Sequence, residues 1–70
     1  MLRQPVQSSN VASIGYVPES QTLEVEFKDS AIYQYLGVPA ALYDALMRAP
    51  SKGAFLHERI KDRFSYRRIR

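Results

Sequence analysis

Apolar and polar residues alternate most clearly in the stretch TLEVEFK, residues 22–28. The apolar positions of this stretch are Leu23, Val25 and Phe27, and charged residues occupy the positions that follow them. A period of two over a whole segment predicts a β-strand with one buried and one solvated face. We therefore expect Glu24 and Glu26 to lie on the solvated face of this strand.

The segments on either side of this strand also have strand patterns. In VASIGYV, residues 11–17, Ile14 and Tyr16 share one face, and the polar run 18–21 that follows is typical of a turn. Asp29 and Ser30 then fit a short hairpin connection to a further strand, AIYQYLG, residues 31–37. The pattern thus predicts a meander of neighbouring antiparallel strands.

The strand at 31–37 allows two orientations, because both of its faces carry apolar residues. Turning Gln34 inward would bury an amide that needs several hydrogen-bond partners, which is costly. We therefore expect Tyr33 and Tyr35 on the core side. Ile32 and Leu36 are then expected on the outer face, covered by the N-terminal segment or by a partner.

Two short helices are predicted after the strands. Pro39 is suited to the first turn of a helix over residues 40–49, and Pro50 ends it. Ser51 is a good N-cap for a second helix, in which Phe55, Leu56, Ile60 and Phe64 recur at helical spacing.

The predicted fold class is α+β: a three-stranded antiparallel β-meander followed by two short helices packed on one sheet face. Residues 1–9 show no periodicity and are expected to be loosely ordered, residues 10–66 to form one domain, and residues 67–70 to form a basic tail.

Composition limits what this domain can be. The chain has 70 residues, 46% of them hydrophobic, and no cysteine, so it forms one small domain without disulfides or a thiolate zinc site. No signal peptide and no membrane-length apolar run is visible, which predicts a cytoplasmic protein with no membrane partner.

The net charge of +3 is unevenly distributed. Residues 59–70 hold six basic residues and one acidic residue, a net of +5, whereas residues 1–58 hold four basic and six acidic residues, a net of −2. A basic end on a neutral-to-acidic body suggests an anionic partner, although short basic ends also serve solubility alone.

Several short motifs occur in a recognisable order along the chain: IGY at 14–16, LEVEF at 23–27, YQY at 33–35, GVP at 37–39, APSKGAFL at 49–56 and IKDRFSYRR at 60–68. Together they resemble the KTSC domain, a small bacterial and phage module also found at the C-terminus of some lysyl-tRNA synthetases. The resemblance covers almost the whole chain and supports the predicted fold. It implies no established molecular function, and it suggests RNA binding only through the synthetase context.

The candidate nucleic-acid-binding residues are basic or aromatic side chains near the C-terminus, with one outlying lysine. Arg and Lys pair with phosphates, and aromatic rings among them can stack on unpaired bases. The alternative is that the rings belong to the core and the basic residues are merely solvated. The candidates are Lys52, Arg59, Lys61, Arg63, Tyr66, Arg67 and Arg68.

Two further motifs have a functional and a structural interpretation. The SKG run at 51–53 could hold a phosphate at a helix start, or be an ordinary Ser cap with a glycine that allows close packing. Tyr33 and Tyr35 could stack on bases, but their alternation with the strand at 22–28 favours the core, with only the hydroxyls at a rim.

Enzyme activity is not expected. His57 is the only histidine, and the neighbouring acids on its helix do not converge with it to hold a metal. No serine is set beside His57 and an acid, so no catalytic residue, metal or cofactor is predicted.

Two function classes remain: weak binding of RNA or another polyanion through the basic C-terminal helix and tail, or a protein-interaction or homodimerisation module that uses the outer sheet face or edge.

Overall fold

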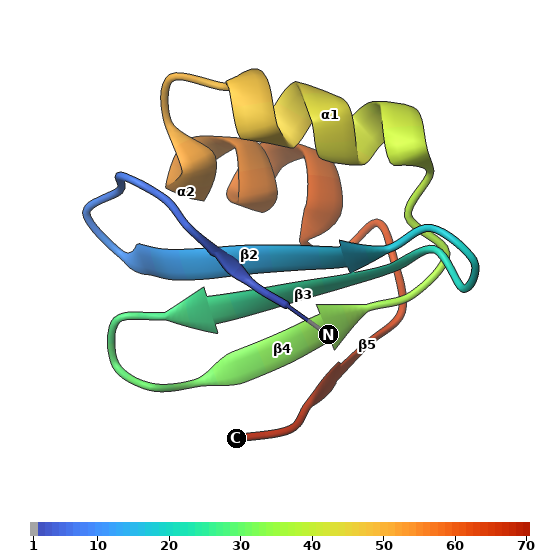
Figure 1. Ribbon diagram of the computed structural model, residues 1–70, viewed down its shortest axis with the longest axis horizontal. Helices are drawn as coiled ribbons and strands as arrows, with labels where there is room; N and C mark the ends of the chain where they lie inside the picture. Colours follow the sequence, from blue (N-terminus) through green and yellow to red (C-terminus); the bar gives the residue numbers. More distant parts are fainter. Residues whose placement is uncertain (1) are drawn as a thin grey trace.

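The computed structural model describes residues 2–70 and is built on one five-stranded antiparallel sheet with the strand order β1-β2-β3-β4-β5 (Figure 1). The central strands β2, β3 and β4 are the three expected from the sequence. The strands are β1 (Gln4–Pro5), β2 (Val11–Val17), β3 (Thr22–Phe27), β4 (Ile32–Tyr35) and β5 (Tyr66–Arg68).

The expectation of three strands was therefore incomplete, because the sheet has two further strands at its edges. Strand β1 has two residues, one of them a proline, and β5 is the three-residue run Tyr-Arg-Arg. Neither is long enough to show a period of two, so both depend on pairing with a neighbour that is already in place. Strand β5 pairs with β4 only after the chain has passed through both helices.

The helices follow the predicted positions closely. Helix α1 spans Ala40–Arg48, helix α2 spans Lys52–Phe55, and the π-helical segment η1, Leu56–Ile60, continues directly from α2. The predicted Ser51 cap is confirmed, since its hydroxyl accepts a hydrogen bond from the Ala54 N–H at 3.2 Å. Gly37 has a φ of 78°, a left-handed conformation that glycine adopts without strain, and it turns the chain from β4 toward α1.

The helices cover one face of the sheet, and the core lies between the two layers (Figure 1). The register pairs Leu23 with Tyr35 and Val25 with Tyr33, so both tyrosines share the face of the apolar β3 residues, as the sequence predicted. The buried core residues are Val11, Ile14, Leu23, Val25, Tyr35, Val38, Leu46, Leu56 and Ile60.

The outer sheet face differs from the expectation at Glu24, which is only 5% exposed instead of solvated. Of the two apolar residues expected to be covered there, Ile32 is 5% exposed and Leu36 37%. The segment before β1 crosses this face in Figure 1, and Arg3 forms an ion pair with Glu24. The backbone of Ile32 exchanges hydrogen bonds with residues 69–70. Chain termini that looked unstructured in the sequence therefore contact the outer face, Arg3 through the Glu24 side chain and residues 69–70 through the Ile32 backbone.

Candidate nucleic-acid interface

Tyrosine rings gather on the helix-side face of β4 and β5. Tyr33 stacks on Tyr66 with ring centroids 5.6 Å apart, and on Tyr35 at 6.4 Å. Phe27 meets the edge of Tyr33 at 5.8 Å, which extends the aromatic cluster onto β3. Such offset and edge contacts are the geometries that aromatic pairs prefer. The rings form one continuous row across three neighbouring strands.

The exposure of these rings changes along the row, because the helices leave the outermost strand uncovered (Figure 1). Tyr35 is 6% exposed and belongs to the core, whereas Tyr66, its partner across the β4–β5 pair, is 56% exposed. Tyr33 lies between these extremes. A half-exposed ring at a sheet surface offers a face on which another planar group can stack.

Tyr35 stays uncharged in this cluster. Burial raises the pKa of its hydroxyl above the ordinary range, and the neighbouring Tyr33, Tyr66 and Asp62 add to that rise. A neutral phenol does not repel an anion, so Tyr35 is compatible with a negatively charged ligand next to it.

Arg68 completes this surface. Its register opposite Tyr33 places it on the same face, with the guanidinium carbon 5.9 Å from the Tyr33 ring centroid. Its Nε donates to the Arg70 carbonyl at 3.1 Å. Within residues 2–70 the ion pairs are Arg3 with Glu24 and Glu26, and Arg70 with Glu26, so Arg68 enters none of them. We call Tyr33, Tyr66 and Arg68 together the tyrosine surface.

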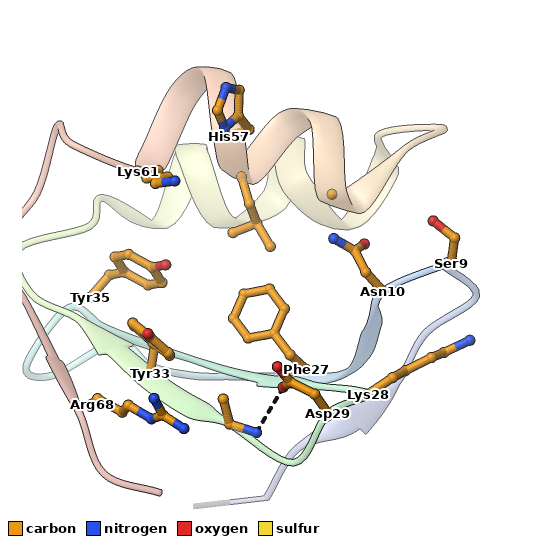
Figure 2. A pocket seen from close by; sticks show the side chains of 13 residues that line it. Ser9, Asn10, Phe27, Lys28, Asp29, Tyr33, Tyr35, His57, Lys61 and Arg68 are labelled. Carbon is orange, nitrogen blue, oxygen red and sulfur yellow. Dashed lines mark hydrogen bonds between the residues drawn. The ribbon is translucent and has the colours of Figure 1, made fainter.

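A pocket of about 510 Å³ opens beside the tyrosine surface, between the sheet and the α2–η1 segment (Figure 2). We call it the interlayer pocket. Pockets of 300–1,000 Å³ are of the size that holds small ligands. Its lining residues are Ser9, Asn10, Phe27, Lys28, Asp29, Ala31, Tyr33, Tyr35, Gly53, Leu56, His57, Lys61 and Arg68.

The two ends of the interlayer pocket differ in chemistry. At one end, Figure 2 shows Lys61 near Tyr35 and Arg68 near Tyr33, with the two tyrosines between the cations. Phe27 lies in the middle, and Asn10, Ser9 and Lys28 lie at the other end. Asp29, the one carboxylate in the lining, accepts a hydrogen bond from the Ala31 N–H at 3.0 Å. Its acceptor capacity is thus partly used within the hairpin, and the lining keeps a positive balance.

Gly53 allows α2 to approach the end of the pocket where Asn10 lies. A Cβ at this position would lie 2.6 Å from Asn10 Oδ1, closer than such atoms can approach. This contact fits the structural interpretation of the SKG run, in which Gly53 allows close packing. The Ser51 cap belongs to the same interpretation.

The other predicted site residues are spread over the molecule. Lys52 donates through Nζ to the Ala49 carbonyl at 2.6 Å. Arg59 lies 5.5 Å from the Phe55 ring centroid, and Arg63 Nε donates to the Glu58 carbonyl at 3.1 Å. None of these three basic residues lines the interlayer pocket.

Arg67 lies on the opposite side of the sheet from Arg68. It pairs with Gln34 in the β4–β5 register, and its Nε donates to Gln34 Oε1 at 2.9 Å. Gln34 in turn donates to Glu24 Oε1 at 2.8 Å, so Arg67 joins the polar network of the outer face. The predicted basic tail is therefore divided between two faces by the alternation of a strand.

Sequence reasoning missed the pocket residues that come from the other end of the sheet: Asn10, Phe27, Lys28 and Asp29. Phe27 and Lys28 were assigned only strand roles, and Asn10 only marked the start of a pattern. The one local signal was Gly53, whose missing side chain indicates a close neighbour but does not say which residue it is.

Within residues 2–70, no group of three or more His, Asp or Glu side chains is placed to hold a metal ion. No helix in that range has the length and apolar character needed to cross a membrane.

The model of the KTSC domain family matches residues 7–64 of this chain. The name of that family states no enzymatic activity. An uncharacterized protein from Stutzerimonas stutzeri is 43% identical over 70 residues and matches along 99% of both chains. A lysine–tRNA ligase from Nostoc sp. is 38% identical over 63 residues, which are 90% of this chain but 11% of the ligase.

Similarity to a solved structure extends to the whole fold. The crystal structure of a KTSC domain protein from Yersinia pestis superimposes with a TM-score of 0.95 and 46% sequence identity, covering 99% of this chain and 97% of that one. The β1 and β5 edges, absent from the sequence prediction, lie inside the matched range.

Proposed function

This chain belongs to the KTSC domain family, and on that basis we propose that it binds single-stranded RNA weakly through the tyrosine surface. The observation that carries the proposal is the half-exposed Tyr66 ring, stacked on Tyr33 beside an arginine that has no carboxylate partner within residues 2–70. Exposed aromatic residues on a sheet, flanked by cations, are how several modules bind unpaired bases and their phosphates.

RNA is favoured over other polyanions for two reasons. An aromatic ring contributes nothing specific to a purely anionic partner, whereas it stacks on the face of a base. Three of the similar proteins are lysine–tRNA ligases, which by their name act on an RNA. This chain spans 11% of each of those ligases, so only the RNA class is carried over, and none of the enzymatic activity.

The competing hypothesis is a protein-interaction or dimerisation module. It relied on an apolar outer face, and Ile32 on that face is buried in the folded monomer. Ion pairs from Arg3 and Arg70 occupy the same face. This hypothesis retains the β5 edge and Leu36, which is 37% exposed. A mass that rises with protein concentration in sedimentation would favour it over RNA binding.

The test is a titration with a six-nucleotide oligoribonucleotide, followed by amide chemical shifts at two salt concentrations. If Lys61, Arg68 and one further cation contact phosphates, the affinity should fall roughly 20-fold between 50 and 200 mM salt, given a slope of about −0.7 per phosphate contacted on a single strand. Shifts should cluster on β4, β5 and the end of η1.

Adjacent residues of β5 provide a matched control. Arg68→Ala removes a cation from the tyrosine surface and should weaken RNA binding about fivefold or more. Arg67→Ala removes the same charge from the opposite face and should change the affinity less than twofold. Equal effects of the two variants would mean that binding follows net charge alone and that the tyrosine surface has no special role.

A further inference from the structure

We infer that the interlayer pocket takes one unstacked base of the bound strand, with its phosphate at Arg68. This inference rests on the proposed function and specifies how the RNA is held. It commits the pocket to one ligand class, a nucleotide.

The pocket is continuous with the tyrosine surface. Tyr33 and Arg68 belong to both, so a strand that stacks on Tyr66 reaches the pocket mouth without leaving the protein. A base adjacent to the stacked one would lie over the opening. Proteins that recognise unpaired RNA commonly splay such a base out of its stack and hold it separately.

The groups along the pocket follow the order of the parts of a nucleotide. Arg68 lies beside Tyr33, at the end that the pocket shares with the tyrosine surface, which suits a phosphate, and Lys61 lies beyond Tyr35 (Figure 2). Phe27 in the middle and Leu56 on η1 provide apolar contact for the faces of a base. At the far end, Asn10 Oδ1 accepts from the Ser8 hydroxyl at 3.2 Å, and its Nδ2 group is the donor that a base edge can use.

Charge supports the same orientation. Lys28, Lys61 and Arg68 stand in the lining against Asp29 alone, and Asp29 is hydrogen-bonded to the Ala31 N–H. None of the three cations enters an ion pair within residues 2–70. A neutral apolar ligand would leave these cations uncompensated, whereas a nucleotide monophosphate supplies a counter-charge at one end and an aromatic plane in the middle.

The experiment compares ligands that differ only in the bases. A six-nucleotide oligoadenylate is titrated against the ribose-phosphate hexamer that lacks all bases, and adenosine 5′-monophosphate against ribose 5-phosphate. Stacking contributes about 1–3 kcal/mol per base, so each base-bearing ligand should bind about fivefold tighter or more than its baseless counterpart. Shifts from the monophosphate should centre on Phe27, Leu56 and Lys61.

Two aromatic variants locate the base. Phe27→Leu removes a ring from the pocket but keeps an apolar side chain, and it should reduce the advantage of adenosine 5′-monophosphate over ribose 5-phosphate to less than about twofold. Tyr43→Leu removes a ring that stacks on Tyr16 at 4.6 Å and does not line the pocket, so it should leave that advantage unchanged. Thermal melts of both variants establish that they are folded under the titration conditions.

The outcomes separate the two proposals. Equal affinity for adenosine 5′-monophosphate and ribose 5-phosphate, with the oligoadenylate still bound more tightly than the baseless hexamer, would overturn base insertion and leave stacking on the tyrosine surface. Absence of any hexamer binding would overturn the proposed function and base insertion with it. Loss of the base advantage in Tyr43→Leu but not in Phe27→Leu would place the base outside the interlayer pocket and overturn the inference.

Discussion

At the scale of single residues, Glu24 shows how far a strand position can depart from its pattern. It occupies a polar position of an alternating strand, yet it is almost fully buried. Burial by itself would raise the pKa of this carboxyl. The hydrogen bonds from Gln34 and Arg3, together with the charge of Arg3, outweigh burial and hold the pKa below its ordinary range. Glu24 is thus a charged group kept inside by its partners.

The lowered pKa of Glu24 predicts an acid-sensitive contribution to stability. A carboxyl whose pKa is depressed in the folded state stabilises the protein above its unfolded-state pKa, and that stability is lost as the pH falls through the folded-state pKa. Urea unfolding of the wild type should therefore lose more free energy between about pH 6 and pH 3 than unfolding of Glu24→Gln. Glu19→Gln, at an exposed turn position, should behave like the wild type.

At the scale of elements, the N-terminal segment covers part of the outer sheet face and contacts its polar side chains. Strand β1 pairs with β2 through only two residues. Arg3, next to it, donates to Ser13 Oγ at 3.1 Å, and Ser13 donates to Glu26 Oε1 at 2.8 Å. The segment contributes little regular structure, and its main contribution is the cation that compensates the glutamates of β3.

Removing residues 1–5 should destabilise the domain by about 1–3 kcal/mol at neutral pH, because Glu24 loses its charged partner. The same deletion in a Glu24→Gln background should cost clearly less, since a neutral amide needs no counter-charge. Urea denaturation of the four chains measures this coupling. Equal losses in both backgrounds would show instead that the backbone pairing of β1 is what stabilises the sheet.

At the scale of the whole molecule, the free energy of unfolding of a small chain is low, so each buried aromatic side chain contributes a large share of it. Seventy residues bury only about 60% of the surface that the unfolded chain exposes. Tyr35 belongs to the core cluster and pairs across strands with Tyr66. Substitution of the buried Tyr35 should therefore affect mainly stability, and substitution of the exposed Tyr66 mainly RNA binding.

Tyr35→Ala should lower the free energy of unfolding by about 3–5 kcal/mol, a large part of the stability that a domain of this size has. Tyr66→Ala, one strand away and half exposed, should cost less than about 1 kcal/mol and should instead weaken RNA binding. Thermal melts and RNA titrations of both variants check this division. Comparable losses of stability would mean that β5 is an integral part of the core.

Much of the fold follows from local patterns in the sequence. The period of two identified the three central strands, Pro39 and Pro50 bounded the first helix, and Ser51 marked the start of the second. The orientation of Tyr33 and Tyr35 also followed, from the cost of burying Gln34. Even so, Gln34 is half-buried, because Glu24 and Arg67 satisfy its amide on the outer face.

The site could be predicted only in part, because it combines residues from distant parts of the chain. Tyr66, Lys61 and Arg68 were among the predicted binding residues, and the structure brings them to one side of the molecule with Phe27. It places Arg67 on the other side, which a count of basic residues in a tail cannot reveal.

The sequence by itself determined the central strands, the helices and the core face, because propensity and periodicity act between residues that are close along the chain. The tertiary structure decided the edge strands, the burial of Glu24 and the interlayer pocket. Each of these depends on a contact between distant segments: β5 with β4, Arg3 with Glu24, and Gly53 with Asn10. Such contacts leave no local period in the sequence, since they form only after the chain has folded back on itself.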